Sequence, residues 1–343
     1  MSTYTVTQTQ PAAHKTRARA LSLTLVAASR SAPLLDIPIE LGLEILGLGL
    51  THTPFSTLAS VSKAFCALVS TILYRDVIID SVESMSLFFR TTKSKSPEFL
   101  NTHVKTLAIT IEPWRFTSAT RIELEGIVAA CTGLRALSVA RPGILGKPLS
   151  HHNGALHRVL PSEVTIQSFD AAPPFEWVRS ATETTVPVPP GTAAHLSASI
   201  THLRISEPGD TWHSPLSILA FFGSTPHLTH FALARRMDAN ADNDQVFVDE
   251  VATLLASRRN LKMIVVRIFP AHWHHDAGSA DSSSIWTALA SVAEADKRLV
   301  LVSAGFTWAH VPMPRVGTPG EFSDFWQRAR KDWEARGQQD LEQ

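Results

Sequence analysis

The stretch Leu228-Thr-His-Phe231-Ala-Leu233 places apolar residues at its first, fourth and sixth positions, and this spacing recurs along the chain. Four other copies and a weaker fifth lie elsewhere: Val104–Ile109, Leu134–Val139, Ile200–Ile205, Leu261–Val266 and the weaker Ile166–Ala171. The six copies start 28 to 34 residues apart. Such a near-constant period is typical of a repeat architecture, in which each unit packs on the next. Each copy is short and apolar enough to form a strand.

Helical segments separate these predicted strands. Leu216–Phe222 follows Ser214 as a cap and Pro215 in the first turn, both favoured at helix starts. The other helical segments and a last strand are Ile122–Ala130, Val246–Ser257, Ile285–Ala295 and Leu299–Val302. Units of helix, turn and strand stack into a parallel sheet with helices on its outer side. We therefore predict an α/β body over residues 81–317, with a coincidentally spaced α/β sandwich as the alternative.

A helical module over residues 34–80 precedes this body. Asp36 can cap a helix and Pro38 suits its first turn. Apolar residues then recur at i, i+4 and i+7, which predicts one apolar face: Leu41, Ile45 and Leu48. Phe55–Arg75 reads as two short helices, and Val77–Ile79 suits a strand. Three helices this small cannot bury all of their apolar side chains, so part of the surface should meet a partner or the second domain. The alternative is that these helices only cap the larger body and bind nothing.

One motif in this module is specific. Its elements, in order, are Pro38-x-Glu40-Leu41-x-x-Glu44-Ile45-Leu46, Leu58-x-x-Val61-Ser62-Lys63-x-Phe65-x-x-Leu68 and Leu73-Tyr74-Arg75. This pattern resembles the F-box and its fungal F-box-like relatives, although Ser62 and Phe65 stand where many members have Cys and Trp. The resemblance implies a three-helix unit that docks on the small adaptor subunit of a cullin-RING ubiquitin ligase. The scaffold or contact roles would fall to Ile37, Pro38, Leu41, Ile45, Leu46, Leu58, Val61, Lys63, Phe65 and Leu73.

The body resembles irregular leucine-rich repeats, which commonly follow an F-box, except that no regular Asn follows the strands. The fold class expected is thus α/β (α+β), with a three-helix module before an irregular solenoid. Alternate residues of the strands should point away from the helices. Their larger polar or flexible members are the expected contacts for a protein client: His202, Arg204, His230, Met263 and Arg267.

The two ends of the chain carry weaker signals. Residues 1–33 are rich in Ser, Thr, Ala and Gln and have no acidic residue, so we expect disorder, with a signal or transit peptide as the alternative. Residues 318–343 predict an amphipathic helix and tail, with Thr318-Pro-Gly-Glu321 as a capping box. Its apolar face comprises Phe322, Phe325, Trp326, Ala329 and Trp333. We expect this helix to seal the end of the solenoid, with a separate partner-binding role as the alternative.

Composition and motifs argue against most other functions. The chain has 31 basic and 31 acidic residues, so no global field attracts nucleic acid or anionic lipid. Cys66 and Cys131 lie in apolar stretches, where packed, reduced thiols are expected, and this favours the cytoplasm or nucleus. The cluster His272-Trp-His-His-Asp276 lacks a zinc-like ligand set, and no nucleophile or phosphate-loop motif occurs. We therefore assign no catalytic, cofactor or metal residues.

The function expected from the sequence is a non-catalytic adaptor. The F-box-like module would bind the ligase adaptor subunit and the body would bind a protein client, without nucleic acid, membrane or cofactor. Gly42, Gly47 and Gly49 weaken the first helix, so a scaffolding repeat protein whose module no longer joins a ligase is the alternative. A hydrolase or metal enzyme is a remote third reading.

Overall fold

The protein's structure, a computed structural model, describes residues 37–50, 52–111, 115, 117–141, 160–170, 199–270, 280–303 and 321–339. The chain divides into two compact units, Met1–Thr53 and Pro54–Gln343, so the division falls inside the segment 34–80. Each unit is described by itself. The expectations for residues 1–33, the 318–321 capping box and the histidine cluster 272–276 lie outside the described residues.

The described part of the first unit contains helix α1, Ile39–Leu50. Its predicted apolar stripe is exposed: Leu41, Ile45 and Leu48 expose 51%, 49% and 65% of their surface. On another side of the helix, Leu46 is buried with only 3% exposed. The helix is therefore apolar on more than one face, and the face with the i, i+4, i+7 spacing is the one that solvent reaches.

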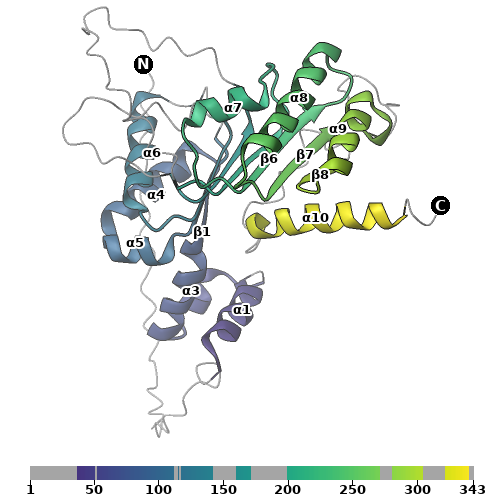
Figure 1. The fold of residues 1–343 in the computed structure, drawn as a ribbon. Coiled ribbons are helices and arrows are strands. Elements are labelled where there is room, and N and C mark those ends of the chain that lie inside the picture. The colour runs from purple at the N-terminus through teal and green to yellow at the C-terminus, as the bar shows by residue number, and fades with distance from the viewer. Residues whose placement is uncertain are drawn as a thin grey trace, which may run out of the picture. The chain divides into compact units, whose positions relative to one another are not determined.

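The second unit contains alternating helices and strands (Figure 1). Its elements are α2 (Phe55–Ala59), α3 (Lys63–Arg75), β1 (Asp76–Ile79), α4 (Val82–Ser94), α5 (Pro97–His103), β2 (Thr106–Ile109), α6 (Ser118–Ala130), β3 (Ala136–Val139), β4 (Glu163–Ser168), β5 (His202–Glu207), α7 (Pro215–Phe222), β6 (His230–Arg236), α8 (Ala241–Ser257), β7 (Met263–Phe269), η5 (Ala280–Ser282), α9 (Ser284–Ala295), β8 (Leu299–Ser303) and α10 (Glu321–Gln339). The α/β class and the helix–strand alternation are confirmed.

The described strands form one all-parallel sheet in which each strand pairs with its neighbour in the sequence, from β1 to β8. Five predicted copies of the apolar spacing occupy equivalent positions. The weaker copy at Ile166–Ala171 is wrong in register, because Ile166 pairs with Val139 and Ile205 at the end of the motif rather than at its start. The copy that fits runs from the buried Pro161 to Ile166. Proline at its first position hides it from a search for aliphatic residues.

Side-chain caps explain where most helices begin. In α3 to α9, a Ser, Thr or Asn side chain accepts a hydrogen bond from a backbone N–H in the first turn. Asn240 caps α8, which starts at Ala241, five residues before the predicted start at Val246. Two further helices, α4 and α5, begin after Ser81 and Ser96 and were not predicted from the sequence. Among the described helices, none combines the length and apolar character needed to cross a membrane.

Helices α4 to α9 cover one face of the sheet, which we call the helix face. Its core combines strand residues such as Leu107, Phe231 and Ile264 with helix residues such as Met85 and Leu289, all fully buried. Cys131 lies in this core, where burial raises the pKa of its thiol to about 12. Cys66 is exposed, so the expectation of a packed thiol is wrong there.

Helix α10 packs on the opposite face, which we call the α10 face (Figure 1). Its apolar side chains Phe325, Trp326 and Ala329 contact a cluster from the last three strands: Ala232, Met263, Val265 and Val300. The expectation that this helix seals the end of the solenoid is therefore corrected, because it lies across a face. Trp333 reaches the other layer, where it meets Trp286 of α9 with ring centroids 6.5 Å apart.

A ladder of three hydroxyl groups links four strands, β3 to β6, where they begin. The hydroxyls of Ser162, Thr201 and Thr229 donate to the carbonyls of Arg135, Ser162 and Thr201 at 3.2, 3.1 and 3.1 Å. Each hydroxyl therefore binds the preceding repeat at the equivalent position. This ladder supplies side-chain support between units that lack a regular Asn.

Candidate functional site

A row of polar and flexible side chains crosses the α10 face at the start of four strands. Strand pairing places Glu163 beside His202, His202 beside His230, and His230 beside Met263. The next row on this face includes Arg204, which pairs with Thr165. Because alternate residues of a strand share a face, these two rows point toward α10 rather than toward the helix-face core.

The two histidines of this row stack face to face. Their ring centroids lie 4.2 Å apart and their planes differ by 10°. Trp326 of α10 lies against both, with centroid distances of 5.5 Å to His202 and 5.3 Å to His230. Two positive charges at this separation would repel by about 4 kcal/mol at an effective dielectric constant near 20. The stack is therefore built for uncharged imidazoles.

Hydrogen bonds from the hydroxyl ladder set the tautomer of both rings. Thr201 Oγ1 lies 2.9 Å from His202 Nδ1, and Thr229 Oγ1 lies 2.8 Å from His230 Nδ1. Each hydroxyl already donates its proton to a backbone carbonyl, so it accepts from the imidazole. Both Nδ1 atoms therefore carry a proton, and each Nε2 keeps a lone pair that can accept a hydrogen bond.

The surroundings of the stack keep it uncharged at neutral pH. Burial lowers the pKa of His230 to about 4, and the charges of His202, Lys262 and Arg330 add to this effect. Burial and Lys262 also lower the pKa of His202. Burial raises the pKa of the Glu163 carboxyl.

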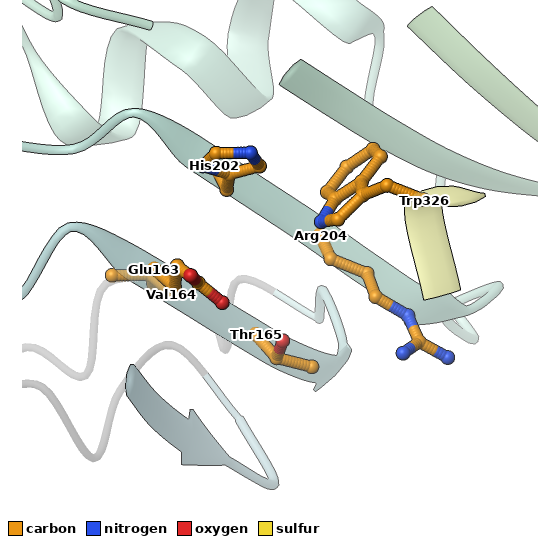
Figure 2. A pocket seen from close by; sticks show the side chains of 6 residues that line it. All are labelled: Glu163, Val164, Thr165, His202, Arg204 and Trp326. Atoms are coloured by element: carbon orange, nitrogen blue, oxygen red, sulfur yellow. The ribbon is translucent and has the colours of Figure 1, made fainter. Parts of the chain in front are cut away.

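Aromatic side chains of α10 cover the polar rows. The Arg204 guanidinium lies 3.9 Å from the ring centroid of Phe325, a cation–π contact. Figure 2 shows Glu163 and Thr165 from β4, His202 and Arg204 from β5, and Trp326 from α10. These side chains line a small interior space, which has a volume of about 10 Å³. A space of that size holds one water molecule at most. The helix therefore closes this end of the site.

A larger groove opens along α10 on the other side of Trp326. It has a volume of about 400 Å³ and is lined by His230, Met263, Trp326, Gln327, Arg330, Lys331 and Glu334. Of the lining residues, Met263 and Trp326 expose only 5% and 7% of their surface, so they form an apolar floor. The α10 residues at i, i+3, i+4 and i+7 form one polar wall: Gln327, Arg330, Lys331 and Glu334.

The structure brings four of the five expected client-contact residues together. His202, Arg204, His230 and Met263 lie in the two adjacent rows beneath α10. The fifth, Arg267, is farther along β7, where it donates to the Ser206 carbonyl at 3.3 Å and burial lowers its pKa. The sequence analysis left this face open to a client, whereas the structure places a helix of the same chain on part of it.

The residues expected to bind the ligase adaptor differ in exposure. Those that are exposed are Pro38, Leu41, Ile45, Val61, Lys63 and Leu73; Ile37, Leu58 and Phe65 are half-buried; Leu46 is buried. Ser62 caps α3 by accepting from the Phe65 N–H at 3.2 Å. Ser62 therefore has a structural role, as the cap of α3. Within the described residues, the exposed apolar side chains of the module are not packed into a core.

A second charged cluster lies where β3 to β6 end, and it is structural. Asp170 Oδ1 accepts from the N–H groups of Asp210 and Thr211 at 2.5 and 3.0 Å, and its carboxylate also pairs with Arg141. A Cβ atom on Gly209 would lie 2.5 Å from Asp170 Oδ1, so only glycine fits there. These bonds occupy the Asp170 carboxylate and tie the loop after β5 to the end of β4.

Sequence reasoning missed several residues of the α10 face. Glu163 was not predicted because the register of β4 was wrong. Nothing in the sequence distinguished Lys262 from other surface lysines. The Thr-His pair that occurs in two successive repeats, at Thr201 and Thr229, was a usable signal for the hydroxyl–imidazole ladder. Trp326 was recognised as apolar, but its position over the histidines depends on tertiary packing that no local pattern encodes.

Comparisons with known proteins leave this geometry as the main guide to function. No protein-family model matches the sequence, and no curated protein matches it. Within the described parts of the chain, no three His, Cys, Asp or Glu side chains are placed to hold a metal ion. The arrangement offers an aromatic surface, two imidazole acceptors and several cationic groups, which suits recognition of a peptide.

Proposed function

We propose that the protein is a non-catalytic adaptor that recruits a protein client to a cullin-RING ubiquitin ligase in the cytoplasm or nucleus. In this proposal, segment 34–80 is an F-box-like module that docks on the small adaptor subunit of the ligase. The body is an irregular leucine-rich-repeat-like solenoid that binds the client. The chemistry of ubiquitin transfer belongs to other subunits.

The exposed apolar stripe of α1 carries this proposal. Leu41, Ile45 and Leu48 lie on one face of the helix and expose about half or more of their surface. An amphipathic helix normally turns such a stripe toward a core. Each side chain left in water forgoes roughly 1.5–3 kcal/mol of burial free energy. A partner that covers this stripe would recover that free energy, and Leu41 and Ile45 are the positions that the F-box pattern assigns to contact.

The second unit adds two independent supports. Val61 and Leu73, which belong to the same pattern, expose 60% and 47% of their surface near α3. The strands also follow one another in chain order across the sheet, as expected for stacked repeats that each contact only their neighbours. Both features fit a docking module followed by a repeat body.

Co-purification of the ligase adaptor subunit tests the proposal. We expect Leu41→Asp and Ile45→Asp to reduce the adaptor recovered with the tagged full-length protein by at least about tenfold, because an exposed apolar residue that the adaptor would bury is replaced by a charge. Leu46 is unsuitable, since it is buried and its replacement would disturb folding. Ile122→Asp is the matched control, because Ile122 in α6 is 65% exposed and lies outside the module.

Circular dichroism of each variant checks that the fold is kept. Undiminished recovery of the adaptor by both α1 variants, or no recovery by the unaltered protein, would contradict the proposal. Equal losses for Ile122→Asp and the α1 variants would show that the effect is not specific to the module.

A further inference from the structure

The groove along α10 combines an apolar floor with cationic walls. Trp326 and Met263 form the floor, and Arg330 and Lys331 line the wall on α10. Its volume of about 400 Å³ lies within the range of sites that hold small ligands or single large side chains. One large apolar side chain of a partner can therefore enter it and contact the indole.

Positive charge gathers at this groove although the whole chain is balanced. Arg330 and Lys331 line it, and the exposed Lys262 immediately precedes Met263. The charges of Lys262 and Arg330 both act on the imidazole of His230, so Lys262, which is not itself part of the lining, lies near one of the lining residues. Glu334 is the single acidic residue in the lining, and Glu163 lies at the neighbouring interior space. Three cations thus face fewer anions, in a chain with 31 of each sign.

These cations remain available to a ligand. Arg330 is 3.9 Å from Glu334, and both side chains are well exposed, at 39% and 61%. Exposed pairs of this kind contribute about 0–1 kcal/mol. A carboxylate from a partner can therefore replace or join Glu334 at little cost. Lys331 is exposed and projects from the same polar wall.

We propose that the groove along α10 binds an acidic peptide segment of the client. One large apolar side chain of that segment packs on Trp326 and Met263, and flanking carboxylates pair with Lys331, Arg330 and Lys262. This inference rests on the proposed client-binding function and names the chemistry of the client. Phosphate-rich polymers fit less well, because their charged backbone carries no large apolar side chain to pack on Met263 and Trp326.

Fluorescence anisotropy with the full-length protein and labelled peptides tests the inference. The probe is Glu-Asp-Phe-Asp-Glu, with Lys-Lys-Phe-Lys-Lys and Glu-Asp-Ser-Asp-Glu as controls for charge and for the apolar anchor. We expect only the first peptide to bind well. Its affinity should fall steeply between about 0.01 M and 1 M salt, since the Debye length shrinks from about 30 Å to 3 Å.

Charge reversal locates the binding site. Lys331→Glu should weaken binding of the acidic peptide about five- to tenfold, because an attractive charge becomes a repulsive one. Arg259→Glu is the matched control, since Arg259 is exposed and lies outside the lining. Equal affinities for the unaltered protein and Lys331→Glu would overturn the inference, as would tighter binding of an oligodeoxythymidylate of equal charge.

Proton NMR of His230, which lines the groove, supplies a local readout of binding. A bound carboxylate offsets the field of Lys262 and Arg330, so the pKa of His230 should rise when the acidic peptide binds. If the pKa of His230 does not change when the peptide is added, the peptide binds elsewhere on the protein. If the ligase adaptor is recovered but the acidic peptide does not bind, only this inference is wrong. If the peptide binds but the adaptor is not recovered, only the ligase proposal is wrong.

Discussion

The two faces of the sheet differ in what fills them. The helix face is a continuous aliphatic and aromatic core under six helices. It holds a buried ion pair, in which Arg235 donates to Asp244 Oδ1 at 2.6 and 2.8 Å and stacks on Trp212 at 4.4 Å. The α10 face holds a small apolar cluster under one helix, beside half-buried histidines and an arginine.

This difference separates stability from recognition. A large apolar core supplies most of the free energy of folding, so the helix face can hold the repeats together without help from α10. The α10 face can then keep polar groups that a core would exclude. Adjacent residues in a strand, such as Phe231 and Ala232, therefore have different roles, because their side chains point to opposite faces of the sheet.

The largest expected effect comes from opening a cavity in the helix face. Phe231→Ala should lower the free energy of unfolding by about 3–5 kcal/mol, because Phe231 is fully buried in the continuous core. Trp326→Ala should lower the free energy of unfolding by less. The reason is that removing this side chain can cost no more than the free energy with which α10 docks on the sheet. Urea denaturation measures both values.

Hydrogen exchange sharpens this contrast. Trp326→Ala should speed exchange in α10 and leave the amides of β6 and β7 protected, whereas Phe231→Ala should speed exchange throughout the sheet. If hydrogen exchange speeds up throughout the sheet to the same extent in both variants, the two faces form one cooperative core. The distinction between them would then be wrong.

A smaller effect is expected from acid. The pKa of His230 in the folded protein, about 4, lies below its usual value of 6.5, and that of His202 is also lowered. The unfolded chain therefore binds protons first, so stability is complete above pH 6.5 and declines as the pH falls toward 4. Urea midpoints measured across this range should fall.

His230→Phe isolates the imidazole contribution. The variant keeps a ring in contact with His202 and Trp326 but removes one titrating group, so its urea midpoint should depend less on pH in this window. Glu163 acts in the opposite direction, because its raised pKa makes protonation favour the folded state at lower pH. An identical pH dependence in both proteins would rule out His230 as the source of acid sensitivity.

The smallest expected effect tests the hydroxyl ladder. Thr229→Val keeps the shape of the side chain but removes its bonds to the Thr201 carbonyl and to His230 Nδ1. We expect a loss of about 1 kcal/mol in the free energy of unfolding. Thr253→Val removes an exposed bond within α8 and should change stability by less than about 0.5 kcal/mol. Equal losses in the two variants would show that the ladder adds nothing.

Much of the fold followed from local pattern. The apolar spacing predicted the strands of the body, because a buried parallel strand needs apolar side chains whichever units surround it. Pro161 broke the pattern in β4 and shifted its predicted register. Helices α4 and α5 were missed because their caps, Ser81 and Ser96, precede segments rich in polar residues.

The candidate site was predicted only as separate residues. Strand alternation placed His202, Arg204, His230 and Met263 on one face, which the structure has. The position of α10 depends on how Phe325, Trp326 and Ala329 find a cluster contributed by three strands, and such long-range packing leaves no local trace in the sequence. The groove and its charge balance follow from that packing.

The chain-order arrangement of the strands bears on how the protein is made. Each strand from β2 onward finds its partner in the segment synthesised just before it, so no strand has to wait for a distant partner to leave the ribosome. The body can assemble one unit at a time during translation, and β8 and α10 are the last described elements to join.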